Sequence, residues 1–199
     1  MAGPAGCAPG QPPSHGPHSE GTVESYLMLG ALISAVVGAV SDVRAHRIPN
    51  WLSYGSLAIA LALRGVLGSR HGLEQALGGM LVGGGIFFVL FLAGGMGAGD
   101  VKLMAAVSAW AGLKQSGSLL LATALAGGTL AVVYMVSHRR VASTVVNAGQ
   151  LLRFHVTFGI KPHPELNLRS QASLRMPYGL AIAAGTLYLF LSTATFWRG

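Results

Sequence analysis

Long apolar runs that contain almost no charged residues constrain this chain more than any other feature of its sequence. Charged residues make up 10% of the chain and hydrophobic residues 52%, whereas a soluble domain carries about 25% charged residues. An apolar helix of about 20 residues is long enough to cross the ~30 Å hydrocarbon core of a bilayer. We therefore expect an all-α polytopic membrane protein.

Six segments of the chain fit this description, and short polar stretches separate them. They run over about 23–41, 51–67, 73–93, 100–113, 118–137 and 177–196. Between the fifth and the sixth, residues 138–176 carry apolar residues at roughly helical spacing, which favours an amphipathic segment in the membrane interface. Residues 1–22 are rich in Pro, Gly, Ser and His and are expected to form a disordered tail. Residues 23–199 then make up the membrane-embedded domain.

Small residues at helical spacing indicate where these helices pack closely. Ala31, Ala35 and Ala39 lie one turn apart in the first span, and Gly79 and Gly83 are four residues apart in the third. Small side chains let helix backbones approach one another in lipid. Both sets therefore predict close contacts with neighbouring helices.

The charges indicate an orientation in the membrane. The net charge is +7, which in a membrane protein favours cytoplasmic loops and contact with anionic lipid headgroups, so nucleic acid is not expected as a partner. With the amino terminus outside, nine Lys and Arg residues fall in inside loops and four outside. One of those four, Arg64 in the second span, is expected to extend its charged end to the interface. No cofactor and no metal site are expected, and Cys7, the one cysteine, cannot form an intrachain disulfide.

The chain contains two aspartates, Asp42 and Asp100, and each lies at the end of an apolar segment. Each has an ordinary explanation by itself, since Asp42 can be a boundary residue and Asp100 a helix N-cap. Both, however, fall on the predicted cytoplasmic face. Two carboxylates in one site can divide acid–base work, one protonated to polarise a carbonyl and the other ionised to take a proton from water. Because a helix dipole favours an anion at the N-terminus, Asp100 is expected to be the more acidic of the two.

Residues around the aspartates are candidates for supporting roles. Gly97 and Gly99 are expected to give the backbone freedom beside a substrate. Lys102 can pair with Asp100, contact a substrate backbone or serve as an interfacial cation, and these readings stay open. Pro49 restricts the residues before it from continuing a regular helix. Asn50, which follows it, is expected to hold the loop after Asp42 or to bind lipid headgroups, and the structural role is preferred.

Three motifs carry a resemblance to a known family. The sequence GAGDVKL at 97–103 resembles the GxGDxKL signature of the prepilin peptidase (type IV leader peptidase) family. Residues 42–50 resemble its first-aspartate motif, which ends in Ile-Pro-Asn, and Met176–Gly179 resembles the hydrophobic-Pro-aromatic-Gly segment that opens its last span. The resemblance implies a six-span aspartic endopeptidase with Asp42 and Asp100 as the catalytic pair. It also implies removal of short basic leaders from pilin-like precursors at the cytoplasmic face of the inner (cytoplasmic) membrane.

The chain departs from the larger members of that family, which carry CxxC motifs in a long insert and also transfer a methyl group. It has no CxxC, so N-methyltransferase activity is not expected. The short form is similar to the peptidases of Tad/Flp pilus systems. Two alternatives stay open: a preflagellin peptidase or another GxGD intramembrane protease, and a non-enzymatic transporter or assembly scaffold. The oligomeric state is left open by the sequence.

Overall fold

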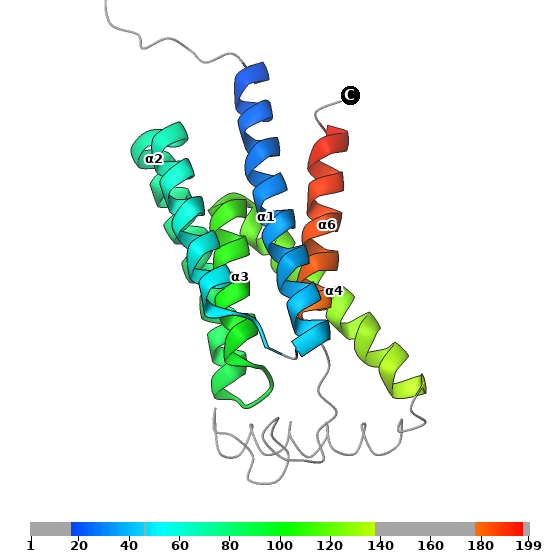
Figure 1. Cartoon of the computed structure of the whole chain (residues 1–199). Coiled ribbons are helices and arrows are strands. Elements are labelled where there is room, and N and C mark those ends of the chain that lie inside the picture. The colour runs from blue at the N-terminus through cyan, green and yellow to red at the C-terminus, as the bar shows by residue number, and fades with distance from the viewer. Residues whose placement is uncertain (1–16, 46, 138–177, 197–199) are drawn as a thin grey trace, which may run out of the picture.

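A computed structural model describes residues 17–45, 47–137 and 178–196 of the chain, and within these ranges the regular elements are all α-helices. The expected all-α class is therefore confirmed. The five helices, in chain order, are α1 (Pro17–Ala45), α2 (Asn50–Leu92), α3 (Ala98–Ala111), α4 (Leu113–Ser137) and α6 (Tyr178–Phe196) (Figure 1).

Among the described residues, three helices are long and apolar enough to cross a membrane: Val23–Ala45 of α1, the whole of α2, and α4. The apolar part of α6, Tyr178–Thr193, is shorter. Helix α3 has 14 residues and, at 1.5 Å per residue, is about 21 Å long, less than the ~30 Å hydrocarbon core. The six spans therefore stay a prediction. The expected interfacial segment at 138–176 lies outside the described residues.

The first helix differs from its expected boundaries at both ends. Helix α1 begins at Pro17 and continues to Ala45, so residues 17–22 of the expected tail are helical and Asp42 lies inside a helix. Helix propagation adds one hydrogen bond for each residue, so a long apolar helix extends into polar flanks. The second and third expected spans both lie in α2, whose helical path is interrupted at Ser69 (φ 51°, ψ −143°), within the expected polar break between them. The ribbon of α2 reverses direction between its two halves (Figure 1).

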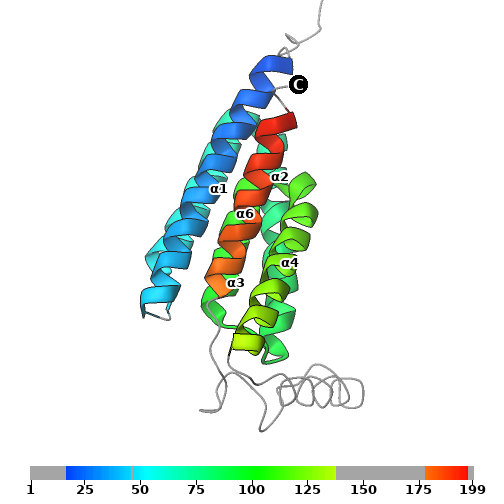
Figure 2. The ribbon, with the colours of Figure 1, turned by 90° about the vertical axis from the view of Figure 1, so that its right-hand side faces the viewer.

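Helix α3 lies at the centre of the bundle and packs against α1, α2, α4 and α6. Figure 2 shows α6 between α1 and α4. Most side chains of α3 are buried, among them Leu103, Met104, Val107 and Trp110. The end of α1 and the starts of α2, α3 and α6 lie at one end of the bundle, opposite the start of α1 (Figure 1). The bundle therefore gathers loop residues from distant parts of the chain at a single end.

Small residues are buried where helices pack closely, as their spacing predicts. Ala31, Ala35 and Ala39 are buried in α1. In α2, a Cβ added to Gly79 or to Gly83 would collide with Ser108 of α3. The alanine face of α1 is thus buried, and the glycine face of α2 packs closely against α3, as predicted.

Candidate functional site

The two aspartates of the chain come together at the loop end of the bundle. Asp42 lies in the last turn of α1 and Asp100 is the third residue of α3. The charge of Asp42 acts on Asp100, although 57 residues of sequence separate them. The expectation that both carboxylates share one face of the protein agrees with this arrangement.

Asp42 is almost fully buried, with 9% of its surface exposed. Its Oδ2 accepts a hydrogen bond of 2.9 Å from the backbone N–H of Gly179, in the first turn of α6. The first N–H groups of a helix have no partner within the helix and carry the positive end of its dipole. Asp42 therefore lies near the C-terminal end of α1 and also caps the N-terminal end of α6, which stabilises its carboxylate.

Gly179 can occupy this position because it has no side chain. A Cβ there would lie 3.0 Å from the Cβ of Asp42, 3.1 Å from its Oδ2 and 3.1 Å from the Cα of Ala39. The backbones of α1 and α6 therefore approach each other beside the carboxylate, which places the N–H of Gly179 within hydrogen-bonding distance.

Asp100 is half-buried at the start of α3, outside the helices long enough to cross a membrane. Its Oδ2 accepts a hydrogen bond of 3.3 Å from the N–H of Gly97, the residue that precedes the helix. This backward contact from the third helical residue is half of a capping box. Burial, and after it the charge of Asp42, raise the pKa of Asp100 to about 7, and the Gly97 hydrogen bond offsets part of this rise.

The raised pKa of Asp100 runs against the expectation that its carboxyl is the more acidic one. That expectation considered only the dipole of the helix that carries each aspartate. Desolvation disfavours the charged form of a carboxyl group, and at Asp100 it outweighs the favourable helix start. Meanwhile Asp42 receives the N-terminus of α6. Asp100 therefore carries a proton below about pH 7.

The two glycines of the GxGD sequence, Gly97 and Gly99, have defined contacts beside Asp100. Gly97 has an ordinary φ of −81° and supplies the N–H for Asp100. Gly99 is already helical, and a Cβ there would lie 3.2 Å from the Cβ of Ile48. The positive φ of this loop belongs to Gly94, at 80°. Gly99 therefore allows the loop after α1 to pack against the turn that carries Asp100.

The other supporting residues predicted from the sequence join the starts of α2 and α3. Pro49 occupies the N-cap position of α2 and Asn50 is its first residue. The Lys102 ammonium donates a hydrogen bond of 3.0 Å to Oδ1 of Asn50 and lies 5.1 Å from the centre of the Tyr54 ring. Lys102 therefore ties the first turn of α3 to the first turn of α2 through a hydrogen bond and a cation–π contact.

Sequence reasoning missed Gly179 and Tyr178 as neighbours of the aspartates. Tyr178 lies near enough to interact electrostatically with Asp100. Both residues belong to the Met176–Gly179 motif, but spacing along the chain does not place that motif beside Asp42. The start of the last helix therefore belongs to the site.

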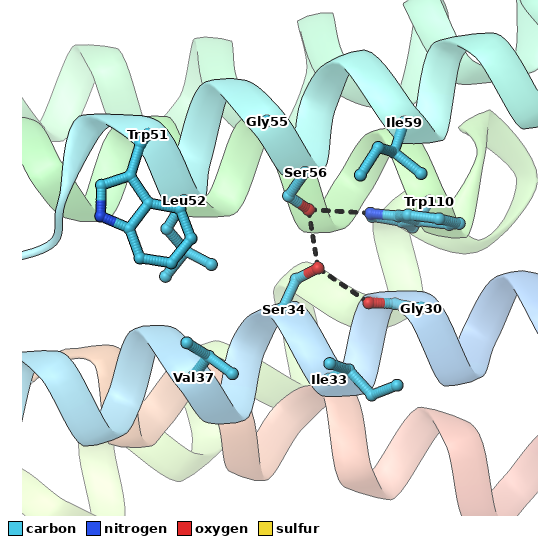
Figure 3. A pocket seen from close by; sticks show the side chains of 10 residues that line it. All are labelled: Gly30, Ile33, Ser34, Val37, Trp51, Leu52, Gly55, Ser56, Ile59 and Trp110. Carbon is cyan, nitrogen blue, oxygen red and sulfur yellow. Dashed lines mark hydrogen bonds between the residues drawn. The ribbon is translucent and has the colours of Figure 1, made fainter.

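A cavity of about 320 Å³ lies between α1 and α2, with Trp110 of α3 in its lining (Figure 3). It is lined by ten residues, all without a titratable group, and its polar side chains Ser34 and Ser56 hydrogen bond to each other at 2.7 Å. The cavity is therefore separate in character from the acidic site. In the described part of the chain, no group of three or more His, Cys, Asp or Glu residues could hold a metal ion.

Comparison with known proteins identifies the family. No curated protein and no solved structure matches the chain. The model of the type IV leader peptidase family matches residues 28–132, a stretch that covers more than half of the chain and contains both aspartates. That match confirms the resemblance carried by the aspartate motifs and implies that the chain is a peptidase. The apolar helices of the chain indicate a membrane protein. The chain belongs to the type IV leader peptidase family.

Proposed function

We propose that the protein is a membrane aspartic endopeptidase that removes the short basic leader from type IV pilin-like (Flp/Tad) precursors at the cytoplasmic face of the membrane. The observation that carries this proposal is the coupling of the two aspartates: the charge of Asp42 helps to raise the pKa of Asp100 to about 7. Family membership supports the peptide substrate. The basic leader follows from the resemblance of the motifs.

The environments of the two carboxyls suggest a division of roles. Asp42, which accepts the Gly179 hydrogen bond, is the ionised base that takes a proton from the attacking water. Asp100, protonated near neutral pH, donates its proton to the scissile carbonyl oxygen as the tetrahedral intermediate forms. When the C–N bond breaks, Asp42 passes its proton to the leaving amine and the intermediate's hydroxyl returns a proton to Asp100. One water is consumed, and both carboxyls regain their starting states.

The test is processing of a co-expressed pilin precursor by full-length Asp42→Asn and Asp100→Asn variants. Each variant keeps the size of the side chain but removes one acid–base group, so we expect processing to fall by at least about 1,000-fold. Glu74→Gln serves as a control, because Glu74 is exposed and pairs only with exposed Arg70 among its described contacts. Mass spectrometry of the released leader would identify the cleaved bond. Full processing by either aspartate variant would reject the catalytic pair.

The alternative substrates are separated by the same assay. A preflagellin peptidase or another GxGD intramembrane protease would depend on the same two aspartates but cleave a different set of precursors, so a cleavage profile over precursor peptides decides between them. A transporter or scaffold would leave every precursor uncut. The family match favours a peptidase over this last alternative.

A further inference from the structure

Arg64 lies buried at the end of the bundle that is opposite to the aspartates. It belongs to the first half of α2 and has 4% of its surface exposed. The expectation that its charged end reaches the interface is therefore wrong. A buried guanidinium needs hydrogen-bond partners and a counter-charge to offset its desolvation, and Arg64 finds them on two other helices.

The first set of partners is the C-terminal end of α3. The Nε and Nη2 groups of Arg64 donate to the carbonyl oxygen of Trp110 at 3.0 and 2.7 Å, and Nη2 also donates to that of Ala111 at 3.0 Å. The last carbonyls of a helix lack partners within the helix and carry the negative end of its dipole. Arg64 therefore caps α3 with a positive charge where the next residue, Gly112, turns the chain with a φ of 78°.

The second partner is Glu24 on α1. Its Oε2 lies 3.0 Å from Nη2 of Arg64 and its Oε1 lies 3.4 Å from Nη1, an arrangement in which both carboxylate oxygens face the guanidinium. The geometry suits arginine, because a planar fork can bind a carboxylate on one side and carbonyls on the other. One side chain of α2 thus joins the first half of α1 to the last turn of α3.

A second chain of contacts joins the same two helices. The indole Nε1 of Trp110 donates to the hydroxyl of Ser56 at 2.9 Å, Ser56 donates to Ser34 at 2.7 Å, and Ser34 donates to the carbonyl of Gly30 at 2.8 Å (Figure 3). Trp110 is therefore tied to α1 through α2 by its side chain as well as by its backbone. The last turn of α3 is fixed against α1 at two points.

We propose that Arg64 is a positioning residue that sets how closely Asp42 and Asp100 approach, by holding the far ends of α1 and α3 together. The proposal rests on the proposed function of the two aspartates. Helix α1 carries Glu24 near its start and Asp42 in its last turn, while α3 carries Asp100 in its first turn and Trp110 near its end. Ten residues of helix, about 15 Å, connect Asp100 to Trp110. Because so short a helix moves as one body, a shift of its capped end moves Asp100 by a similar amount.

The experiment compares full-length Arg64→Met, Arg64→Lys and Glu24→Ala with Arg70→Met. Arg70 is the matched control, an arginine of the same helix in an exposed pair with Glu74. Cleavage kinetics give kcat and KM. Labelling aspartate with ¹³C gives two carboxyl signals, since the chain has two aspartates, and their titration reads the pKa of Asp100 without any substrate.

For Arg64→Met we expect kcat to fall about 10- to 100-fold with KM little changed, because a misplacement of about 1 Å has that effect on catalysis. The pKa of Asp100 should fall, because the influence of Asp42 on it weakens with distance. Arg64→Lys should restore most of kcat, since an ammonium can still bind the carbonyls. Glu24→Ala removes the link to α1 but leaves the cap of α3, so it should lower kcat and the pKa in a protein that folds.

Two results would overturn the proposal. One is an unchanged kcat and an unchanged pKa of Asp100 in folded Arg64→Met or, if that variant does not fold, in Glu24→Ala. The other is a loss of activity that only follows the folded fraction, with the pKa of Asp100 unchanged, which would make Arg64 a stabilising residue alone. If the aspartate variants process the precursor fully, the proposed function fails. The titration of Asp100 still decides the positioning role in that case, since it does not depend on cleavage.

Discussion

The replacement of Gly179 by alanine tests the contact that joins the last helix to the acidic site. The added Cβ would lie 3.0 Å from the Cβ of Asp42 and 3.1 Å from the Cα of Ala39. These neighbours are main-chain atoms or the first atom of a side chain, and they cannot turn aside as the end of a flexible side chain could. The first turn of α6 must therefore move away from α1. The hydrogen bond of 2.9 Å from Gly179 to Oδ2 of Asp42 then lengthens or breaks.

The size of the effect follows from the kind of hydrogen bond that is lost. A hydrogen bond to a charged group contributes about 1.5–3 kcal/mol, and about 1.4 kcal/mol corresponds to a factor of ten in rate. If the ionised carboxylate of Asp42 is the base, kcat should fall about 10- to 150-fold in Gly179→Ala. KM should change less, because Gly179 acts through Asp42.

The assay measures the initial rate of leader removal from a purified precursor by the full-length enzyme. Gly128→Ala is the control, since a Cβ at Gly128 of α4 would have no neighbour within 4 Å. We expect the control to keep its kcat within about twofold, as is usual for a substitution away from structural features. A folded Gly179→Ala with the wild-type kcat, alongside an inactive Asp42→Asn, would refute the role of this hydrogen bond.

Three further predictions follow from the same contacts. Since the pKa of Asp100 is raised to about 7, its proton is present below that pH and lost above it. If Asp100 is the acid, kcat should fall by about tenfold per unit of rising pH beyond 7. A rate that stays flat from pH 7 to 9 would contradict this role. Ionising the buried Asp100 lowers the stability of the folded protein, and this loss begins near pH 3.8 and is complete above about pH 7. Asp100→Asn should therefore raise the melting temperature at pH 8 and lose that gain toward pH 4. An equal gain at both pH values would count against burial as the cause. Gly83→Ala should lower the free energy of unfolding by about 1–3 kcal/mol, because the added Cβ would collide with Ser108. Gly85→Ala, whose Cβ would have open space around it, is the control in the same thermal unfolding measurement. Equal stability of the two variants would contradict the packing argument.

The helical class and the packing faces could be read from the sequence because both depend on local spacing. Apolar runs of span length predicted helices, and Ala31, Ala35 and Ala39 are buried as their one-turn spacing indicated. The pair of glycines in α2 likewise meets α3 at Ser108. The two aspartates could be singled out because the chain contains no others. Each of these conclusions needs nothing beyond residue type and position along the chain.

The contacts between distant segments could not be predicted in the same way. Gly179 reaches Asp42 across 137 residues of sequence, and this contact places the N-terminus of α6 on a carboxylate that closes α1. Burial of Asp100 then raises its pKa against the tendency of its own helix start. Arg64 looks in sequence like an arginine that reaches the interface, yet it is buried between Glu24 and the end of α3.

The sequence by itself determined that this chain forms apolar helices, where those helices pack closely, and which two carboxyls are available for chemistry. These are consequences of side-chain size, polarity and helical period. The tertiary structure alone decided the raised pKa of Asp100 and the anchoring of the two helices that carry the aspartates. The physical reason is that desolvation and electrostatic interactions depend on distances between atoms in three dimensions, and spacing along the chain does not contain those distances.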